Sequence, residues 1–438
     1  MPSVTRHFPE SQENCSCKRL AKEAGVLEIR RVMKFLATGS ALVSLLSSAA
    51  ASPTCDADSC HDHDHSHAAD EADAFGRFND WSVGDFLFAG LNLQGIGGVV
   101  DGDPEELAVG AHDPMRERFS AQTIEPTLLL RGGPVEVFAN AVFSQDADGG
   151  WDAEMEEYHA TFFHDGFRLK GGSFLAENGL HGAEHAHGLD WVNAPLASSV
   201  FLGEHGLLLR GAEISWQPTR GPLRFIAGLG RADTHDHHGH DEHEDEHEEE
   251  HEHEHEDEHE HEHDHADWHE AEFASTIVNL RATGTWRAGE EDRFLAGTSL
   301  ATGRNGFGHE TTVLGADFRW SRKPAGADHE WSWNSEILWR RVGTGGGSGT
   351  DWGAGSELTL HWREMWDFGL RCEWLEGMPE IGLDERVRLS PVVTRWLDSG
   401  RRIGLRTQYD CDLLDGGRVD HSLWFQLNVA LGSREEPR

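Results

Sequence analysis

The run Leu423-Trp424-Phe425-Gln426-Leu427-Asn428-Val429-Ala430-Leu431 alternates without a break between apolar residues and a second, mostly polar set. Successive side chains of a β-strand point to opposite faces, so residues two apart share a face. One face therefore carries Leu423, Phe425, Leu427, Val429 and Leu431, and the other carries Trp424, Gln426, Asn428 and Ala430. The run predicts a β-strand with one apolar face.

The same rhythm recurs from about residue 80 to Leu431, in segments that end in Gly, Pro, Asp or Asn. Clear examples are 278–286, 357–362 and 402–409, and the whole region contains about 16 such segments. Two folds fit this alternation. A soluble sandwich buries the apolar face in a core, whereas a membrane barrel turns it to lipid and encloses the polar face.

The lengths of the connections favour the barrel, because outer-membrane barrels have short periplasmic turns and longer outer loops. Short connections are expected at 131–134, 165–166, 218–222, 288–292, 322–329, 363–365 and 398–400, and longer ones at 95–118, 145–155, 176–206, 233–272, 304–309, 343–350, 377–385 and 411–420. We therefore predict an all-β chain: a transmembrane antiparallel β-barrel of about 16 strands over 80–432, with a short tail at 433–438. Its location would be the outer membrane of a Gram-negative cell.

The N-terminal region has the features of an export signal. Lys34 precedes an apolar stretch at 35–46 and the small residues Ala49-Ala50-Ala51, which predicts a signal peptide over 33–51. Residues 1–32 show no fold pattern and are interpreted as a mis-assigned or unstructured extension. Residues 52–79 would form a periplasmic tail rich in His and Asp, with four candidate metal ligands: His61, His63, His65 and His67.

Charge and motifs argue against two other classes of protein. The formal net charge is −41, and it is still −21 after removal of the 20 carboxylates between His235 and Glu272, so a nucleic-acid partner is not expected. The GxSxG, HExxH, GxGxxG and Walker patterns do not occur in a suitable context, and we expect no enzyme.

The segment His235 to Glu272 contains 14 His and 20 acidic residues and has almost nothing apolar to bury. It predicts a disordered extracellular loop over 233–272. Imidazole and carboxylate groups suit zinc, and also nickel, cobalt and copper, so this tract should capture metal weakly and reversibly. The candidate ligands are His235, His237, His238, His240, His243, His247, His251, His253, His255, His259, His261, His263, His265 and His269.

The connection 176–206 differs from the other long ones because apolar residues, such as Leu189 and Phe201, are spread among its polar ones. These anchors indicate that it packs, and by analogy with the third loop of 16-stranded porins it would fold into the lumen and narrow it. An alternative is that its polar groups only satisfy a packed loop. The first candidates for a defined metal site are His181, His185 and His187, and the second are Glu184, Asp190 and Glu204.

Several motifs in and around this connection resemble a family of zinc-associated bacterial outer-membrane proteins with a His-rich loop. They are Gly172-Ser173-Phe174, Asn178-Gly179-Leu180-His181, His185-Ala186-His187, Asp190 to Leu196, Phe201 to Leu207 and the ending Phe425 to Gly432. The resemblance implies a barrel and a link to zinc uptake. Such proteins are often labelled TonB-dependent receptors, but this chain is too short for a plug domain beside a 22-stranded barrel.

Three functional hypotheses follow. The first is a porin-like channel that takes up zinc or a similar divalent ion, with metal captured on the His-rich tract. The second is a general or anion-selective porin, because basic residues fall on the expected lumen face and three acids offset them in part: Arg168, Lys170, Arg281, Arg388 and Arg406 against Glu336, Glu357 and Glu373. The third is a surface protein that buffers metal. The expected partners are outer-membrane lipid, divalent metal ions, a periplasmic metal-binding protein and further copies of the chain in a homotrimer.

Overall fold

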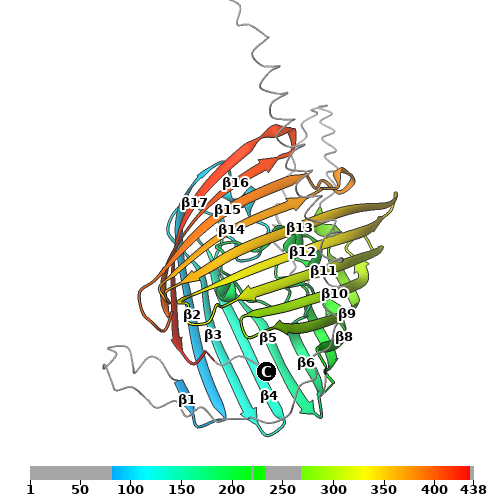
Figure 1. Cartoon of the computed structure of the whole chain (residues 1–438). Coiled ribbons are helices and arrows are strands. Elements are labelled where there is room, and N and C mark those ends of the chain that lie inside the picture. Colours follow the sequence, from blue (N-terminus) through cyan, green and yellow to red (C-terminus); the bar gives the residue numbers. More distant parts are fainter. Residues whose placement is uncertain (1–80, 219–220, 233–267, 435–438) are drawn as a thin grey trace, which may run out of the picture. The chain divides into compact units, whose positions relative to one another are not determined.

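The protein forms a closed antiparallel β-barrel in the computed structural model, which describes residues 81–218, 221–232 and 268–434 (Figure 1). Strands β2 to β17 each pair with the next strand in the chain, and β17 pairs with β2, so the ring has sixteen strands. The predicted transmembrane barrel of about 16 strands is confirmed.

The strands of the ring alternate in direction along the chain. They are β2 (Leu87–Asp101), β3 (Ser120–Gly132), β4 (Val135–Gln145), β5 (Trp151–His164), β6 (Phe167–Leu175), β7 (Leu208–Trp216), β8 (Leu223–Ala232), β9 (Phe273–Ala288), β10 (Asp292–Asn305), β11 (Glu310–Arg322), β12 (His329–Thr344), β13 (Gly347–Trp362), β14 (Trp366–Leu375), β15 (Arg386–Trp396), β16 (Ile403–Leu414) and β17 (Val419–Gly432). A short strand, β1 (Trp81–Val83), pairs with the start of β2 beyond the point where β17 ends.

The helices within the described residues are short. They are α3 (Pro104–Leu107), α4 (Leu196–Leu202) and the 3-10 turns η1 (Ala186–Gly188), η2 (Trp268–Ala271), η3 (Pro379–Ile381) and η4 (Asp415–Gly417). A search of the same residues for a helix long and apolar enough to cross a bilayer finds none.

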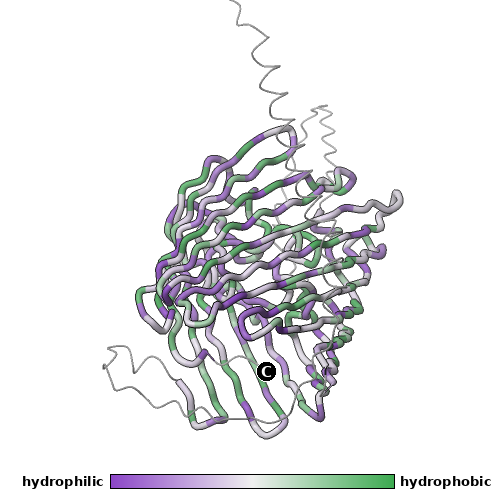
Figure 2. Tube along the Cα trace, in the orientation of Figure 1, coloured by the Kyte–Doolittle hydropathy of each residue, from purple (hydrophilic) through white to green (hydrophobic). Residues whose placement is uncertain are grey.

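The strands turn their apolar faces outward. Leu405 and Phe425 are exposed on the outer wall, whereas their neighbours Arg406 and Gln426 are buried inside. Figure 2 shows the same alternation of hydrophobic and hydrophilic residues along the strands. A closed ring has no unpaired edge, and an apolar outer wall matches lipid, which together are the requirements for a strand-built membrane protein. The protein is an outer-membrane β-barrel, as the sequence predicts.

The predicted short connections are confirmed as turns. They lie at 133–134, 165–166, 289–291, 323–328, 363–365 and 397–402, and the connection between β7 and β8 is described at 217–218 and 221–222. The start of β2 pairs with the end of β17, with Leu91 opposite Leu431, so both ends of the barrel lie on the side of these turns.

Four of the predicted long connections are wrong in their bounds: residues 151–155 of the expected loop at 145–155 belong to β5, residues 411–414 of that at 411–420 belong to β16, and two others differ more. Residues 95–101 belong to β2, and the expected loop at 343–350 is a tight hairpin in which Thr344 pairs with Gly347. This hairpin consists of small and polar residues without an apolar face. Its ladder is held by backbone hydrogen bonds, which a side-chain pattern does not reveal.

A row of glycines crosses three neighbouring strands: Gly172 on β6 pairs with Gly211 on β7, which pairs with Gly230 on β8. Gly172 has φ +142°, and a Cβ there would lie 2.2 Å from the carbonyl oxygen of Tyr158. Glycine in a strand interior permits close backbone approach and bending, and the wall needs both where it curves.

Several predicted segments lie outside the described residues. They are the extension at 1–32, the signal peptide at 33–51, the tail at 52–79 with His61, His63, His65 and His67, and the tract from His235 to His265. The start of the C-terminal tail is described: the backbone N–H of Ser433 donates to the carbonyl oxygen of Ala89 at 2.8 Å.

Candidate functional site

The connection between β6 and β7, residues 176–207 and hereafter the constriction loop, folds inside the barrel. Its helix α4 is wholly buried, and Val200 and Phe201 pack in one apolar cluster with Leu338 and Leu375 of the barrel wall. These contacts place the loop across the lumen, where it restricts the space between the strands.

Arginines of the barrel wall hold the loop by its carbonyl oxygens. Arg406 on β16 is buried and donates at 2.8 Å to both Leu189 and Trp191. Two further wall residues act in the same way: Arg371 donates to the carbonyl oxygen of Asn193 and Arg340 to that of Val200, each at 3.0 Å. Charge-assisted bonds of this kind are stronger than neutral ones, so the loop is firmly fixed.

Acidic and amide side chains of the wall accept from the backbone N–H groups of the loop. The pairs are Leu180 to Glu336 at 3.1 Å, Leu196 to Glu373 at 2.7 Å and Val192 to Gln408 at 2.8 Å. Buried backbone groups need such partners because water does not reach them. The basic residues predicted on the lumen face point inward, but several are paired: Arg281 with Asp317, Arg388 with Asp412 and Arg168 with Glu177.

The three histidines that are the first candidates from the sequence do not converge on one point. His181 Nδ1 lies 2.8 Å from Glu184, and its Nε2 lies 3.4 Å from Glu357. His185 and His187 lie together beside β5 and β3, with stacked rings whose centroids are 5.6 Å apart. The expected single site of His181, His185 and His187 is therefore split into two parts.

His185 is held between two carboxylates of β5. Its Nδ1 lies 2.8 Å from Glu156 and its Nε2 lies 2.9 Å from Glu157. His187 Nδ1 forms a short contact with Glu125 on β3. Burial by itself would lower the pKa of His185, but the two carboxylates outweigh it and hold this pKa well above its usual range. The imidazole is thus charged in the absence of metal.

A β-bulge explains how two consecutive residues of β5 reach the same imidazole. Asn140 on β4 pairs with Glu157, but Val142 pairs with Glu154, so β5 has one extra residue in this interval. The bulge turns both Glu156 and Glu157 into the barrel, and both are buried. Bulges re-aim side chains in this way and are frequent near functional sites.

The second-choice residues lie in different surroundings. Glu184 pairs with His181, and burial raises the pKa of Asp190, which lines a cavity beneath the loop. Glu204 lies 3.5 Å from His269, which lies 3.2 Å from Glu272, and these three groups are close enough to share an ion. Within the described residues, His269 is the member of the predicted tract that joins such a group.

Sequence reasoning missed a second cluster, which combines two loops with β5. His112, in the connection 102–119, lies 3.4 Å from Glu154 and 3.8 Å from Glu156, and His205 lies 3.5 Å from Glu154. Burial would lower the pKa of His112, but Glu156 and Glu154 raise it to about 9. The run Glu154-Met155-Glu156-Glu157 was the available signal, since three carboxylates in one strand need compensating partners.

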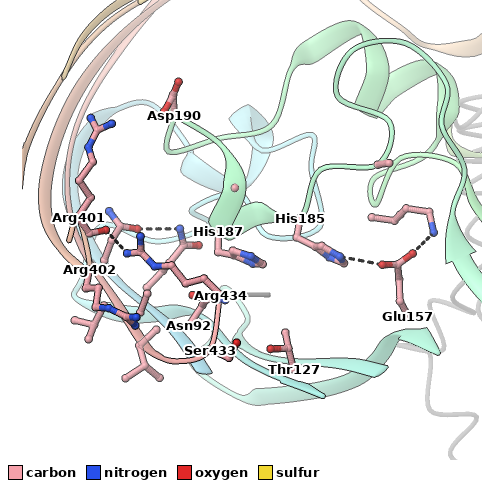
Figure 3. A pocket seen from close by; sticks show the side chains of 18 of the residues that line it. Asn92, Thr127, Glu157, His185, His187, Asp190, Arg401, Arg402, Ser433 and Arg434 are labelled. Atoms are coloured by element: carbon pink, nitrogen blue, oxygen red, sulfur yellow. Dashed lines mark hydrogen bonds and ion pairs between the residues drawn. The ribbon is translucent and has the colours of Figure 1, made fainter. Parts of the chain in front are cut away.

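Two of the cavities that adjoin the loop are lined by its histidines and their carboxylate partners on β5. The larger, about 470 Å³, is lined by His185, His187, Glu157, Asp190 and a group of arginines. Figure 3 shows the bonded pair His185 and Glu157 on one side of it, Arg401 and Arg402 on the other, and His187 between them. The smaller, about 60 Å³, is lined by His112, Glu156, His181, Glu204 and His205. Glu156 and its partner His185 therefore connect the linings of the two cavities.

These features define the chain as a porin-like outer-membrane β-barrel. No family model matches it. An uncharacterized protein of Aquifex aeolicus (strain VF5) is 29% identical over 160 residues, which are 33% of this chain. The aligned segment is 31% of that protein, so the match spans about a third of its length.

Several solved outer-membrane structures are similar in fold. The anion-selective porin from Comamonas acidovorans has a TM-score of 0.49 at 8% identity, covering 78% of this chain and 99% of that one. The channel DcaP of Acinetobacter baumannii has a TM-score of 0.48 at 8% identity, with coverage of 78% and 96%. The trimer form of OmpT from Vibrio cholerae has a TM-score of 0.48 at 9% identity, with coverage of 78% and 98%.

Proposed function

We propose that this barrel is a channel for the uptake of zinc or a similar divalent metal ion. The supporting observation is a series of imidazole and carboxylate groups along the constriction loop. In order they are His269, Glu204, His205, Glu154, His112, Glu156, His185 and Glu157. Glu204 and His205 are consecutive in the chain, and the side chains of every other neighbouring pair lie within 3.8 Å of each other. It begins at the end of the His-rich tract and ends in the larger cavity.

The chemistry of this series suits a borderline divalent cation. Imidazole nitrogen and carboxylate oxygen are the usual ligands of zinc, and nickel, cobalt and copper also accept them. Closely spaced groups allow an ion to exchange one ligand at a time, so that it always has ligands in place of its hydration water. The carboxylates also neutralise the charge of the ion within the barrel.

The His-rich tract would serve capture. Many weak sites next to the entrance raise the local concentration of metal, and an acidic surface attracts cations from a distance. Each site should release its ion readily, because a run of alternating His and Glu does not hold a single fixed tetrahedron.

A flux measurement tests the proposal. Purified protein is reconstituted in liposomes that contain a zinc-sensitive dye, and zinc entry is compared between the wild type and a variant with Gln in place of every His from His235 to His265. This variant keeps the length and the acidic charge of the tract. We expect slower zinc entry at low zinc and equal entry at saturating zinc. Liposomes that stay closed to zinc with the wild-type protein would refute the channel and favour the alternative of a metal-buffering surface protein.

A second candidate function is a general or anion-selective porin. It is favoured by Arg401, Arg402 and Arg434, which line the larger cavity opposite Glu157. Arg401 also pairs with Asp367, which reduces its net effect. The reversal potential in a salt gradient distinguishes the two, since a cation pathway and an anion pathway give opposite signs. A homotrimer, a periplasmic metal-binding partner and the absence of enzyme activity stay predictions from the sequence.

A further inference from the structure

A buried cluster lies where the connection 102–119, the constriction loop and β5 meet. It contains His112 from the first, His205 from the second, and Glu154 and Glu156 from the third. The side chains of His112 and Glu154 are only 10% and 11% exposed. His112, Glu156 and His205 offer ligand atoms that all lie within 4.8 Å of one another, and Glu154 adjoins both imidazoles, in a place that is largely closed to water.

The spacing of this cluster differs from that of His185 and its two carboxylates. His185 lies at 2.8 and 2.9 Å from its carboxylates, which are ordinary hydrogen-bond distances. The corresponding distances in the cluster are 3.4 Å from His112 to Glu154, 3.5 Å from His205 to Glu154 and 3.8 Å from His112 to Glu156. In a tetrahedral zinc site with bonds of about 2.0–2.1 Å, ligand atoms lie roughly 3.3–3.4 Å from one another. The distances from Glu154 to the two imidazoles are therefore close to those between the ligands of a zinc ion.

His112 gives an independent indication. Both of its ring nitrogens are buried, and among the described residues neither has a hydrogen-bond partner. Buried polar atoms normally have such a partner, so an exception needs an explanation. A metal ion bound at Nε2, the nitrogen that faces Glu154 and Glu156, would be the missing partner of that nitrogen.

Neighbouring bonds hold the two loops in register around the cluster. The backbone N–H of Ala111 donates to the carbonyl oxygen of Glu204 at 3.2 Å, so the residues that precede His112 and His205 are joined directly. Asp113 accepts from the backbone N–H of Ala194 at 2.7 Å. Supporting bonds of this kind lower the ordering cost of ligand binding.

We propose that His112, His205, Glu154 and Glu156 form a discrete site for one zinc-like divalent ion. The site is separate from the His-rich tract and from the predicted set of His181, His185 and His187. Its ion fastens the connection 102–119 to the constriction loop and lies next to His185, because Glu156 also contacts that residue. Binding at this site does not require transport, so the two proposals can fail independently.

A competition experiment on the full chain tests the site. The protein is purified in detergent, stripped of metal and equilibrated with zinc and a chelator that outcompetes the weak sites of the tract. We expect the wild type to retain one zinc ion per chain. The variants His112→Ala and His205→Ala should lose it, with a rise in Kd of at least about 100-fold, more than removal of a supporting group causes.

His164→Ala is the matched control, because His164 lies on the same strand as Glu154 but is exposed at the opposite end. It should retain zinc like the wild type. Folding of each variant is checked by heat-dependent gel mobility. Glu154→Gln, which conserves the shape of a ligand, provides a second test.

Cobalt gives a spectroscopic readout of the geometry. Under the same competition, bound Co²⁺ should show the intense visible absorption of a tetrahedral ion, and this absorption should disappear in His112→Ala. Retention of zinc by folded His112→Ala and His205→Ala would overturn the proposal. Complete loss of zinc from the wild type to the chelator, or weak octahedral cobalt bands, would overturn it as well.

Discussion

Replacement of Arg406 by Met tests whether the barrel wall fixes the constriction loop. Arg406 is buried and donates at 2.8 Å to the carbonyl oxygens of Leu189 and Trp191. Methionine fills much of the same space but has no donor, so both carbonyls lose this partner. A hydrogen bond to a charged group contributes about 1.5–3 kcal/mol, and two of them contribute roughly 3–6 kcal/mol. Since 1.4 kcal/mol is a factor of ten, local opening of the loop should increase about 10²- to 10⁴-fold.

Hydrogen exchange measures this opening directly. In α4, the N–H of Ser199 donates to Pro195 and that of Gly203 to Ser199, and peptides covering 189–203 should exchange faster in the variant. Arg395→Met is the control, because Arg395 on β15 donates to the carbonyl oxygen of Met365 at a turn. Unchanged exchange at 189–203 in Arg406→Met, or equal acceleration in the control, would refute the view that wall arginines hold the loop.

Two further predictions concern the wall itself. Gly172→Ala should reduce the fraction of barrel that assembles, because the new Cβ would lie 2.2 Å from the carbonyl oxygen of Tyr158. Gly132→Ala should assemble normally, because a Cβ there meets no atom within 4 Å. Gel mobility before and after heating measures the assembled fraction of both variants. Glu157→Gln should lower zinc flux about tenfold, which corresponds to the loss of about 1.4 kcal/mol of charge-assisted binding at His185. The control Glu291→Gln, at a turn, should leave zinc flux unchanged. Equal flux in the two Gln variants would contradict a role for Glu157.

The strands could be predicted from the sequence because lipid and lumen impose opposite demands on alternate residues. In the segments 402–409 and 423–431 one face is apolar apart from Thr407 and the other is mostly polar, so the outward face could be identified. The hairpin at Thr344 and Gly347 was missed because its residues do not contrast in polarity, and the ladder there depends on the backbone.

The candidate site was predictable only in part. The apolar anchors of the constriction loop indicated packing, and they are buried. The partners of its histidines could not be derived, because His185 and Glu156 are brought together by a bulge that breaks the two-residue period. His112 lies in a connection without any pattern, and its contact with His205 joins two loops that are far apart in the chain. Periodicity describes strands, whereas this cluster is made by loops.

The distribution of charges inside the barrel explains how a fixed loop and a metal pathway can coexist. Strands β12 to β16 supply Arg340, Arg371 and Arg406, which bind the loop through its backbone. Strands β3 and β5 supply carboxylates that face its imidazoles, as at Glu125 and Glu156. The hydrogen bonds from the wall thus order the loop before any ion arrives, and the ion does not have to provide that ordering energy. On the proposal of metal uptake, the tract governs how often an ion arrives, and the fixed His–Glu series governs which ion passes. Changes in the tract should therefore alter the rate of zinc entry at low zinc but not the order of preference among metals.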